Sequence, residues 1–481
     1  MTLLPDNALR ESRCLIDGEW ITERSSFPVT NPATGEVIAT VPRLGAEHTR
    51  MAIEAAHRAG PGWAAMPAAQ RANVLKRWHA LILAHAEPLA QILTEEMGKP
   101  LSEARAEILC GAGYVEWFAE ECRRPVGEVL ASPDATRQLS TVRLPVGVVA
   151  AITPWNFPHA MLARKLAPAL AAGCTVVAKP AELTPLSALA LARLAQEAGV
   201  PPGVLNIVVG DPVTIGSELT ANPLVRKLTF TGSTAVGKLL IRQCAETVKR
   251  VSMELGGNAP FIVFDDADLD AAVAGAMASK FRNAGQTCVC ANRLFVQAGI
   301  YETFTQRLAA AVRDLRVGDG SQPGTTVGPL IDERAVAKAQ HHVDDALARG
   351  ATVVEGNAHL PGNFFAPTVL RDVTMNMLVA RQETFGPVAP LIRFTDEADV
   401  IAQANATEAG LAGYFFTRDI ARAHRVARRL EVGMVGINTG IISTEVAPFG
   451  GIKQSGYGRE GGSGGMADYQ DVKYCCLGNL S

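Results

Sequence analysis

The sequence predicts an α/β protein with two doubly wound open sheets and a small β arm. From Val146 onward, short and continuously apolar segments alternate with helical segments, which is typical of parallel strands covered by helices on both faces. The alternation restarts after Gly257, which indicates a second sheet. Extended stretches at 127–144 and 471–476 belong to neither alternation, and we assign them to the arm.

In chain order, the first predicted elements are short strands at 14–42, divided by turns at Asp17-Gly18 and 31–35. Between about Glu47 and Glu120, apolar residues recur three and four positions apart, which predicts helices. The predicted strands of the two sheets lie at 146–152, 174–178, 204–209, 227–230, 250–253, 261–264 and 294–296, with another near Phe415. The predicted helices between them lie at 161–172, 185–198, 235–245, 269–281, 301–315, 334–348 and 420–429.

Composition excludes several classes of protein. The 481 residues carry a net charge of −3 without a block of like charge, so neither nucleic acid nor a membrane is an expected partner. The apolar runs have strand length, and residues 1–10 lack the apolar core of a signal peptide. Nine scattered cysteines favour a reducing cytoplasm over a disulfide framework. No cysteine or histidine spacing is typical of a metal site, so none is expected.

Two strand ends suggest where a dinucleotide binds. The segment 232–239 resembles a P-loop, but Leu239 stands where Ser or Thr must hold magnesium. It still joins a strand to a helix, whose free N–H groups suit a pyrophosphate; the alternative is a structural turn. Lys179 and Glu182 end another strand and either contact a ribose or form a surface ion pair. The GxGxxG match at 456–461 follows no predicted strand and opens no helix, so we set it aside.

Cys288 is the candidate nucleophile. It follows a predicted helix among small and amide residues, whereas cysteines such as Cys174 lie among apolar residues as structural thiols do. A catalytic thiol needs a base or a positive dipole, and the residues alone leave nucleophile and buried thiol equally open. Glu254 ends a predicted strand and is either a base or a solvated strand end. Asn156 follows the strand 146–152 and either donates to an oxyanion or caps the next helix.

Taken together, these segments resemble the aldehyde dehydrogenase superfamily over about residues 16–474. The strings that carry the resemblance are Pro154-Trp155-Asn156-Phe157-Pro158, Lys179-Pro180-Ala181-Glu182, Phe230-Thr231-Gly232-Ser233-Thr234, Glu254-Leu255-Gly256-Gly257, Gly285-Gln286-Thr287-Cys288 and Glu383-Thr384-Phe385-Gly386-Pro387. The segments 279–293 and 436–443 are most similar to members that oxidise succinic semialdehyde. The resemblance implies the aldehyde dehydrogenase fold and oxidation of a small semialdehyde to succinate.

The same resemblance implies a role for each matching residue. Cys288 attacks the aldehyde to give a thiohemiacetal and then a thioester, Asn156 holds the oxyanion, and Glu254 activates the hydrolytic water. The residues implied to bind the cofactor are Trp155, Lys179, Glu182, Gly232, Ser233, Gly237, Leu255, Glu383 and Phe385. Those implied to grip the distal carboxylate are Arg164, Arg282 and Ser443, the alternative being that both arginines are surface residues.

Cofactor choice and redox control are predicted from single residues. Glu182 accepts hydrogen bonds from a ribose 2′-OH but repels a 2′-phosphate, so NAD is expected in preference to NADP. Cys290, two residues from the nucleophile, is either a disulfide partner in a redox switch or a spectator thiol.

The resemblance also divides the chain. Residues 1–122 and 145–254 are expected to form the NAD-binding domain, 255–455 the catalytic domain, and 123–144 with 456–481 an oligomerisation and bridging segment. A homodimer or homotetramer is expected. The alternative functions are oxidation of glutaric semialdehyde, a cysteine hydrolase or esterase without nicotinamide, and a binding protein that has lost catalysis. The last is disfavoured because Cys288, Glu254 and Asn156 are all present.

Overall fold

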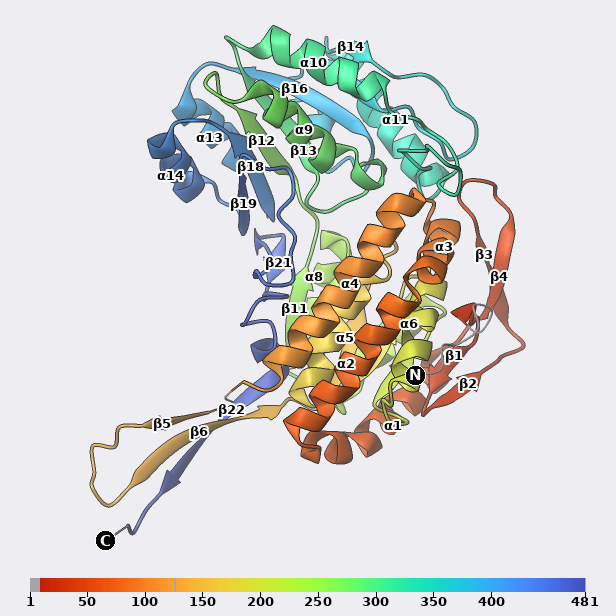
Figure 1. Ribbon diagram of the computed structural model, residues 1–481, viewed down its shortest axis with the longest axis vertical. Helices are drawn as coiled ribbons and strands as arrows, with labels where there is room; N and C mark the ends of the chain where they lie inside the picture. Colours follow the sequence, from red (N-terminus) through yellow and green to blue (C-terminus); the bar gives the residue numbers. More distant parts are fainter. Residues whose placement is uncertain (1–8, 125–126, 481) are drawn as a thin grey trace.

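The computed structural model describes residues 9–124 and 127–480, so the predictions that concern residues 1–8, 125–126 and 481, including much of the signal-peptide argument, lie outside the described residues. Two open sheets with flanking helices lie one above the other, and a β arm projects from the lower part (Figure 1). The predicted fold class, two doubly wound domains with an arm, is confirmed.

The first sheet has eight strands in the order β2-β1-β9-β8-β7-β10-β11-β21. Their bounds are β1 Cys14–Ile16, β2 Glu19–Ile21, β7 Val148–Ile152, β8 Thr175–Lys179, β9 Leu205–Ile207, β10 Val225–Thr231, β11 Arg250–Glu254 and β21 Gly456–Tyr457. The five central strands are parallel, and β1, β2 and β21 pair antiparallel at the edges. The continuous apolar runs are explained by burial on both faces, as in the fully buried β8.

Helices cover both faces of this sheet. They are α1 Ala46–Ala65, α2 Ala68–Ala84, α3 Ala86–Met97, α4 Leu101–Glu121, α5 Ala160–Ala172, α6 Leu186–Glu197, α7 Pro212–Ala221 and α8 Thr234–Ala245. All thirteen residues of α5 are buried, because α2 and α4 pack over the helix on the side away from the sheet (Figure 1). This burial matters for the site, since α5 carries Arg164 and Lys165 into the interior.

The second sheet has seven strands in the order β14-β15-β16-β13-β12-β18-β19, parallel except for β14. Their bounds are β12 Ala259–Val263, β13 Ala291–Gln297, β14 Thr352–Glu355, β15 Thr368–Arg371, β16 Val388–Phe394, β18 Ala412–Phe416 and β19 Met434–Ile437. The helices around it are α9 Leu269–Lys280, α10 Tyr301–Arg313, α11 Glu333–Ala348, α12 Leu378–Arg381, α13 Glu397–Asn405 and α14 Ile420–Arg429.

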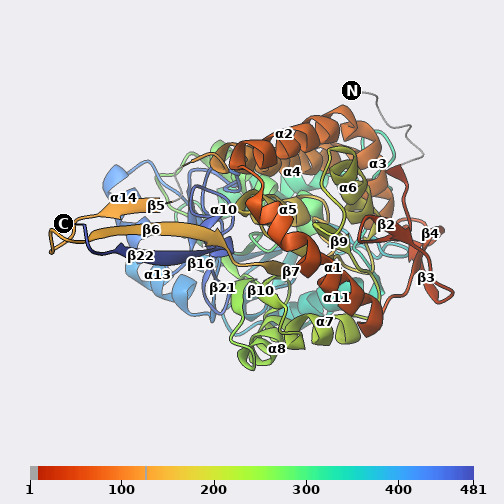
Figure 2. The same ribbon diagram turned by 90° about the horizontal axis from the view of Figure 1, so that it is seen from below.

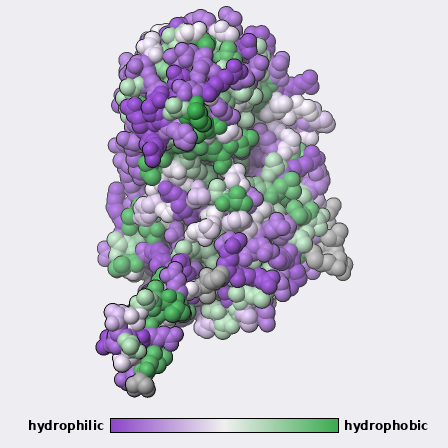
Figure 3. Space-filling model, turned by 60° about the vertical axis from the view of Figure 1, so that its left-hand side comes forward, coloured by the Kyte–Doolittle hydropathy of each residue, from purple (hydrophilic) through white to green (hydrophobic). Residues whose placement is uncertain are grey.

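The arm is a three-stranded sheet of β5 Gly127–Leu130, β6 Gln138–Pro145 and β22 Gln470–Leu477. It projects from one side of the molecule, opposite the hairpin of β3 Ser26–Thr30 and β4 Val37–Pro42 (Figure 2). Hydrophobic side chains cover part of the projection (Figure 3), and Val129, Val472 and Tyr474 are exposed there. Within the described ranges, none of the helices combines the length and apolarity that crossing a bilayer requires.

One pairing departs from the predicted division of the chain. The short strands β17 Ala409–Gly410 and β20 Ile452–Lys453 pair with each other, and β21 then joins β11 in the first sheet. Gly456 and Tyr457, which the sequence assigns to the bridging segment, therefore extend the first sheet. A two-residue strand has no periodicity, so only its pairing reveals it.

Candidate active site

The polar residues predicted from strand ends meet at one edge of the first sheet. Register pairs Ile152 with Lys179 and with Phe230, and Thr231 with Glu254. The carboxyl ends of β7, β8, β10 and β11 are therefore level with one another. Ligands of open α/β sheets bind beyond such ends.

A cleft of about 610 Å³ lies beyond this edge and is closed on its other side by the second domain. Of the predicted residues, the cleft is lined by Trp155, Asn156, Gly232, Ser233, Glu254, Leu255, Cys288, Glu383 and Phe385. The Trp155 and Phe385 rings meet edge to face across it, 5.6 Å between centroids. Thr231 also lines it, and its buried hydroxyl has no hydrogen-bond partner among the described residues. A cleft with a helix N-terminus, carboxylates and an unpartnered hydroxyl fits a dinucleotide.

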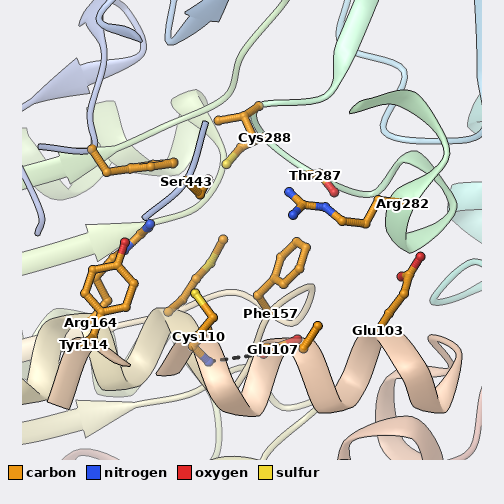
Figure 4. Close-up of a pocket in the computed structure, with 15 residues that line it drawn as sticks. Glu103, Glu107, Cys110, Tyr114, Phe157, Arg164, Arg282, Thr287, Cys288 and Ser443 are labelled. Atoms are coloured by element: carbon orange, nitrogen blue, oxygen red, sulfur yellow. Dashed lines mark hydrogen bonds between the residues drawn. The ribbon is translucent and has the colours of Figure 1, made fainter. Parts of the chain in front are cut away.

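Cys288 also lines a second, smaller cavity of about 150 Å³. Arg164, Arg282 and Ser443, the three predicted substrate residues, line this cavity together with Tyr114, Phe157 and Phe449. The labelled side chains surround a common space above α4 (Figure 4). Cys288 therefore borders both cavities.

The turn before Cys288 has a fixed and unusual backbone. Asn283 and Ala284 both have φ of 53°, a left-handed conformation that costs energy in non-glycine residues and is found at functional sites. The Asn283 backbone N–H donates to Glu103 Oε2 at 2.8 Å, and the Gln286 side-chain oxygen accepts from the Ile331 N–H at 3.0 Å. Cys288 follows this turn. A Cβ on Gly257 would lie 2.3 Å from the Cys288 carbonyl oxygen, so only glycine fits at position 257.

Asn156 is attached to this same turn. Its Nδ2 donates to the Gln286 carbonyl at 2.9 Å, and its own carbonyl accepts from Asn283 Nδ2 at 2.9 Å. One of the two amide hydrogens of Asn156 is thus engaged, and the other is available to a group in the cleft. The structure places Asn156 beside the Cys288 segment rather than at the start of α5.

Burial controls the protonation of the site. It raises the pKa of the Cys288 thiol to about 12; the Arg164 charge opposes this shift, whereas the Glu383 and Glu254 carboxylates add to it. Burial and the neighbouring Glu460 carboxylate raise the pKa of Glu254 well above its ordinary value. Burial raises the pKa of Glu383 to about 7, although the Gly257 N–H donates to its carboxylate at 3.0 Å. A thiol this basic reacts only if a nearby group accepts its proton, and Glu254 lines the same cleft.

The two arginines differ in their partners. Arg164 is buried, and its Nε lies 2.5 Å from Glu460 Oε2, while the centroid of the Phe449 ring lies 4.1 Å from its guanidinium carbon. Its Nη2 has no hydrogen-bond partner among the described residues. Arg282 forms no ion pair with any described residue; it lies 5.6 Å from the Phe157 ring centroid, and its buried Nε has no partner there. Neither is the surface arginine of the alternative interpretation, and of the two only Arg164 forms an ion pair with a described residue.

Three predicted cofactor residues do not line the cleft. Lys179 and Glu182 form an ion pair with each other at the end of β8. Gly237 lies on α8, where a Cβ would be 2.5 Å from the Leu255 side chain, so the glycine permits close packing of the helix. Cys290 is buried and lines neither cavity; its thiol lies 3.6 Å from the Lys280 carbonyl.

Several lining residues escaped prediction because they lie far from the motifs in sequence. Tyr114 and Cys110 come from α4, Lys338 comes from α11, and each looks like an ordinary position of an amphipathic helix. Glu460 lies in the glycine-rich tail and contacts Arg164, which precedes it by 296 residues. The sequence offers one weak indication of such a residue. Arg164 and Lys165 are adjacent cations on α5, and buried cations require an anion nearby.

Comparison with known proteins agrees with this geometry. The model of the aldehyde dehydrogenase family matches residues 20–475. GabD of Escherichia coli K12, an NADP(+) succinate-semialdehyde dehydrogenase, is 58% identical over 99% of this chain and 99% of its own. The 3-sulfolactaldehyde dehydrogenase of Pseudomonas putida is 58% identical over 100% of both chains, and the glutarate-semialdehyde dehydrogenase of Pseudomonas putida KT2440 is 56% identical over 98% and 99%.

A solved structure extends the similarity to three dimensions. The crystal structure of an aldehyde dehydrogenase from Brucella melitensis biovar abortus 2308 has a TM-score of 0.98 with this chain, at 56% identity and 99% coverage of both. The resemblance expected from six short motifs is thereby confirmed over the full fold, and the chain belongs to the aldehyde dehydrogenase family.

Proposed function

We propose that this aldehyde dehydrogenase oxidises succinic semialdehyde to succinate with NAD. The observation that carries the proposal is the position of Cys288 between a dinucleotide-sized cleft and a small cavity that holds the unpaired charge of Arg282. A short aldehyde with a distal carboxylate matches that cavity, because a guanidinium binds a carboxylate through two parallel hydrogen bonds.

The reaction begins at the Cys288 thiol. Glu254 accepts the thiol proton, and the sulfur forms a bond to the aldehyde carbon. The remaining amide hydrogen of Asn156 donates to the resulting oxyanion. A nicotinamide held in the cleft beside Glu383 and Phe385 would supply the hydride acceptor that oxidation of this adduct to a thioester requires. Glu254 releases the first proton to solvent and then removes a proton from water, and the resulting hydroxide adds to the thioester carbon. The carbon–sulfur bond breaks, the acid is released, and Cys288 leaves as the thiol by taking the proton back from Glu254.

Arg282 is the proposed carboxylate anchor, and Arg164 assists it. Arg164 shares its charge with Glu460, whereas Arg282 has the Phe157 ring as its neighbour and no ion-pair partner within the described residues. Ser443 lines the same cavity and offers a hydroxyl. Glutaric semialdehyde remains the alternative substrate, since one methylene is typically discriminated by only about 10–200-fold. A relative named for 3-sulfolactaldehyde makes a sulfonate a third anion to test.

The preference for NAD rests on Glu182. Its carboxylate suits a 2′-OH and repels a 2′-phosphate, although Lys179 neutralises part of that charge. One relative at 58% identity is named for NADP(+), so a preference for NAD would set this chain apart from that relative. A higher kcat/KM with NADP than with NAD would contradict it.

One set of assays tests the proposed function. NADH formation is followed with succinic, glutaric, 3-sulfolactic and uncharged aldehydes of similar length. Arg282→Met should lower kcat/KM for succinic semialdehyde about 10–150-fold, the cost of a hydrogen bond to a charged group, and leave the uncharged aldehydes unaffected. Arg58→Met, at an exposed arginine paired with Asp17, is the matched control. If no aldehyde gives NADH, the cysteine hydrolase is the function that remains. Equal efficiency with uncharged aldehydes would exclude the anion pocket.

Two further expectations belong to the same proposal. The exposed apolar side chains of β5, β6 and β22 support assembly into a homodimer or homotetramer through the arm. A disulfide between Cys288 and Cys290 requires the Cys290 thiol to turn away from the Lys280 carbonyl. Peroxide inactivation that persists in Cys290→Ala, or that dithiothreitol does not reverse, would count against this switch.

A further inference from the structure

A buried ion pair lies at the edge of the site, and its carboxylate partner, Glu107, also lines the smaller cavity. Lys99 Nζ is 2.6 Å from Glu107 Oε2, and the two side chains are 0% and 1% exposed. Glu107 belongs to α4, and Lys99 lies two residues before that helix begins. Replacing a buried ion pair with apolar residues is often neutral or stabilising, so stability alone does not explain this one.

Both partners of the pair also hold the loop that carries Asn156. Lys99 Nζ donates to the Asn156 carbonyl at 2.8 Å and lies 3.8 Å above the centroid of the Phe157 ring. Glu107 Oε1 accepts from the backbone N–H groups of His159 at 3.0 Å and Ala160 at 3.2 Å. The ion pair therefore fixes the loop at its middle and at its end.

The carbonyl of Asn156 is consequently held from two sides. Lys99 Nζ approaches it from the first domain, and Asn283 Nδ2 from the turn that precedes Cys288. Figure 4 shows Glu107 on α4 below Phe157, on the side of the cavity away from Cys288. A residue whose carbonyl is fixed by two donors presents its side-chain amide in one direction.

We propose that Lys99 and Glu107 are positioning residues, which fix the Asn156 amide at the place where the oxyanion forms. The inference rests on the proposed function, in which Asn156 donates to that oxyanion. Removing one such donor typically lowers turnover about 10²–10³-fold, and a displacement of about 1 Å costs up to about 10²-fold. Loss of the ion pair is thus expected to lower the rate of thioester formation by about 10–100-fold.

A double-mutant cycle tests the inference. The pre-steady-state burst of NADH is measured at saturating aldehyde and cofactor for the wild type, Lys99→Met, Asn156→Ala and the double variant. If Lys99 acts through Asn156, Lys99→Met slows the burst in the wild-type background and has no further effect when Asn156 is already alanine. Because Lys99→Met leaves the Glu107 charge unpaired, Lys99→Met/Glu107→Gln provides a neutral pair for the same cycle.

Glu96 provides the matched control. It is also a buried carboxylate that accepts two backbone N–H groups at a helix start, from Leu186 at 2.7 Å and Ser187 at 2.8 Å, but it holds α6 rather than the Asn156 loop. Glu96→Gln should lower Tm and leave the burst rate unchanged.

The outcomes separate the inference from its premise. An equal slowing by Lys99→Met in both backgrounds, or an unchanged burst in Lys99→Met/Glu107→Gln, would overturn the positioning role. A wild type that forms no NADH with any aldehyde would overturn the proposed function instead. An Asn156→Ala variant with a normal burst would overturn the premise that Asn156 holds the oxyanion.

Discussion

Gly257→Ala should strongly impair turnover, although the substitution adds only one methyl group. A Cβ at this position would lie 2.3 Å from the carbonyl oxygen of Cys288, and ordinary contact begins near 3.4 Å. Both atoms belong to the backbone or are attached to it directly, so the two segments must separate by about 1 Å. Displacing a reacting group by that distance costs up to about 10²-fold in rate. We expect kcat/KM for the aldehyde to fall by about that factor.

The assay compares kcat/KM, Tm and the alkylation rate of Cys288 in the wild type and the variant. Gly299→Ala is the control, because it adds the same methyl group where no heavy atom lies within 4 Å. Its kinetic constants should match the wild type. Wild-type kcat/KM in Gly257→Ala would refute the reasoning, since it would mean that the Cys288 backbone can retreat without moving the thiol out of line.

Two other predictions concern titration and cofactor choice. The pKa of Glu254 is raised by burial and Glu460, so kcat should fall about tenfold per unit as pH drops through that raised pKa, because the protonated carboxyl cannot accept a proton from water. Glu254→Gln should remove this acidic limb and lower kcat by about 10²–10⁴-fold, and a limb that survives would point to another base. Glu182→Ser should raise the NADP to NAD ratio of kcat/KM about tenfold, since Lys179 is then free to face a 2′-phosphate. If steady-state assays give an unchanged NADP to NAD ratio of kcat/KM, Glu182 does not discriminate between the 2′-OH and the 2′-phosphate of the ribose.

The sequence allowed the fold class and the central site residues to be predicted. Strand–helix alternation reports burial on both faces of a sheet, and that is a local property of each segment. Glu254 and Asn156 could be identified because the carboxyl ends of parallel strands lie at one edge, whatever the order of the strands. Cys288 stood out by its polar neighbours, and the family resemblance gave it a role that the residues alone left open.

The short strand at Gly456 and the unexpected site residues show where sequence reasoning fails. Periodicity needs several residues, so a two-residue strand that exists only through its pairing with β11 leaves no trace. Lys338 and Tyr114 face the cavities from helices whose patterns are those of ordinary amphipathic helices.

The partners of the charged residues were decided by the tertiary structure alone. Lys165 meets Glu460 across 295 residues of chain, and Lys99 reaches the Asn156 carbonyl 57 residues away. Sequence identifies a cation but not the anion that neutralises it, because ion pairing depends on distances between elements that only packing fixes. That difference separates Arg164, which forms an ion pair with Glu460, from Arg282, which forms none with a described residue and is the anchor that we propose for the substrate.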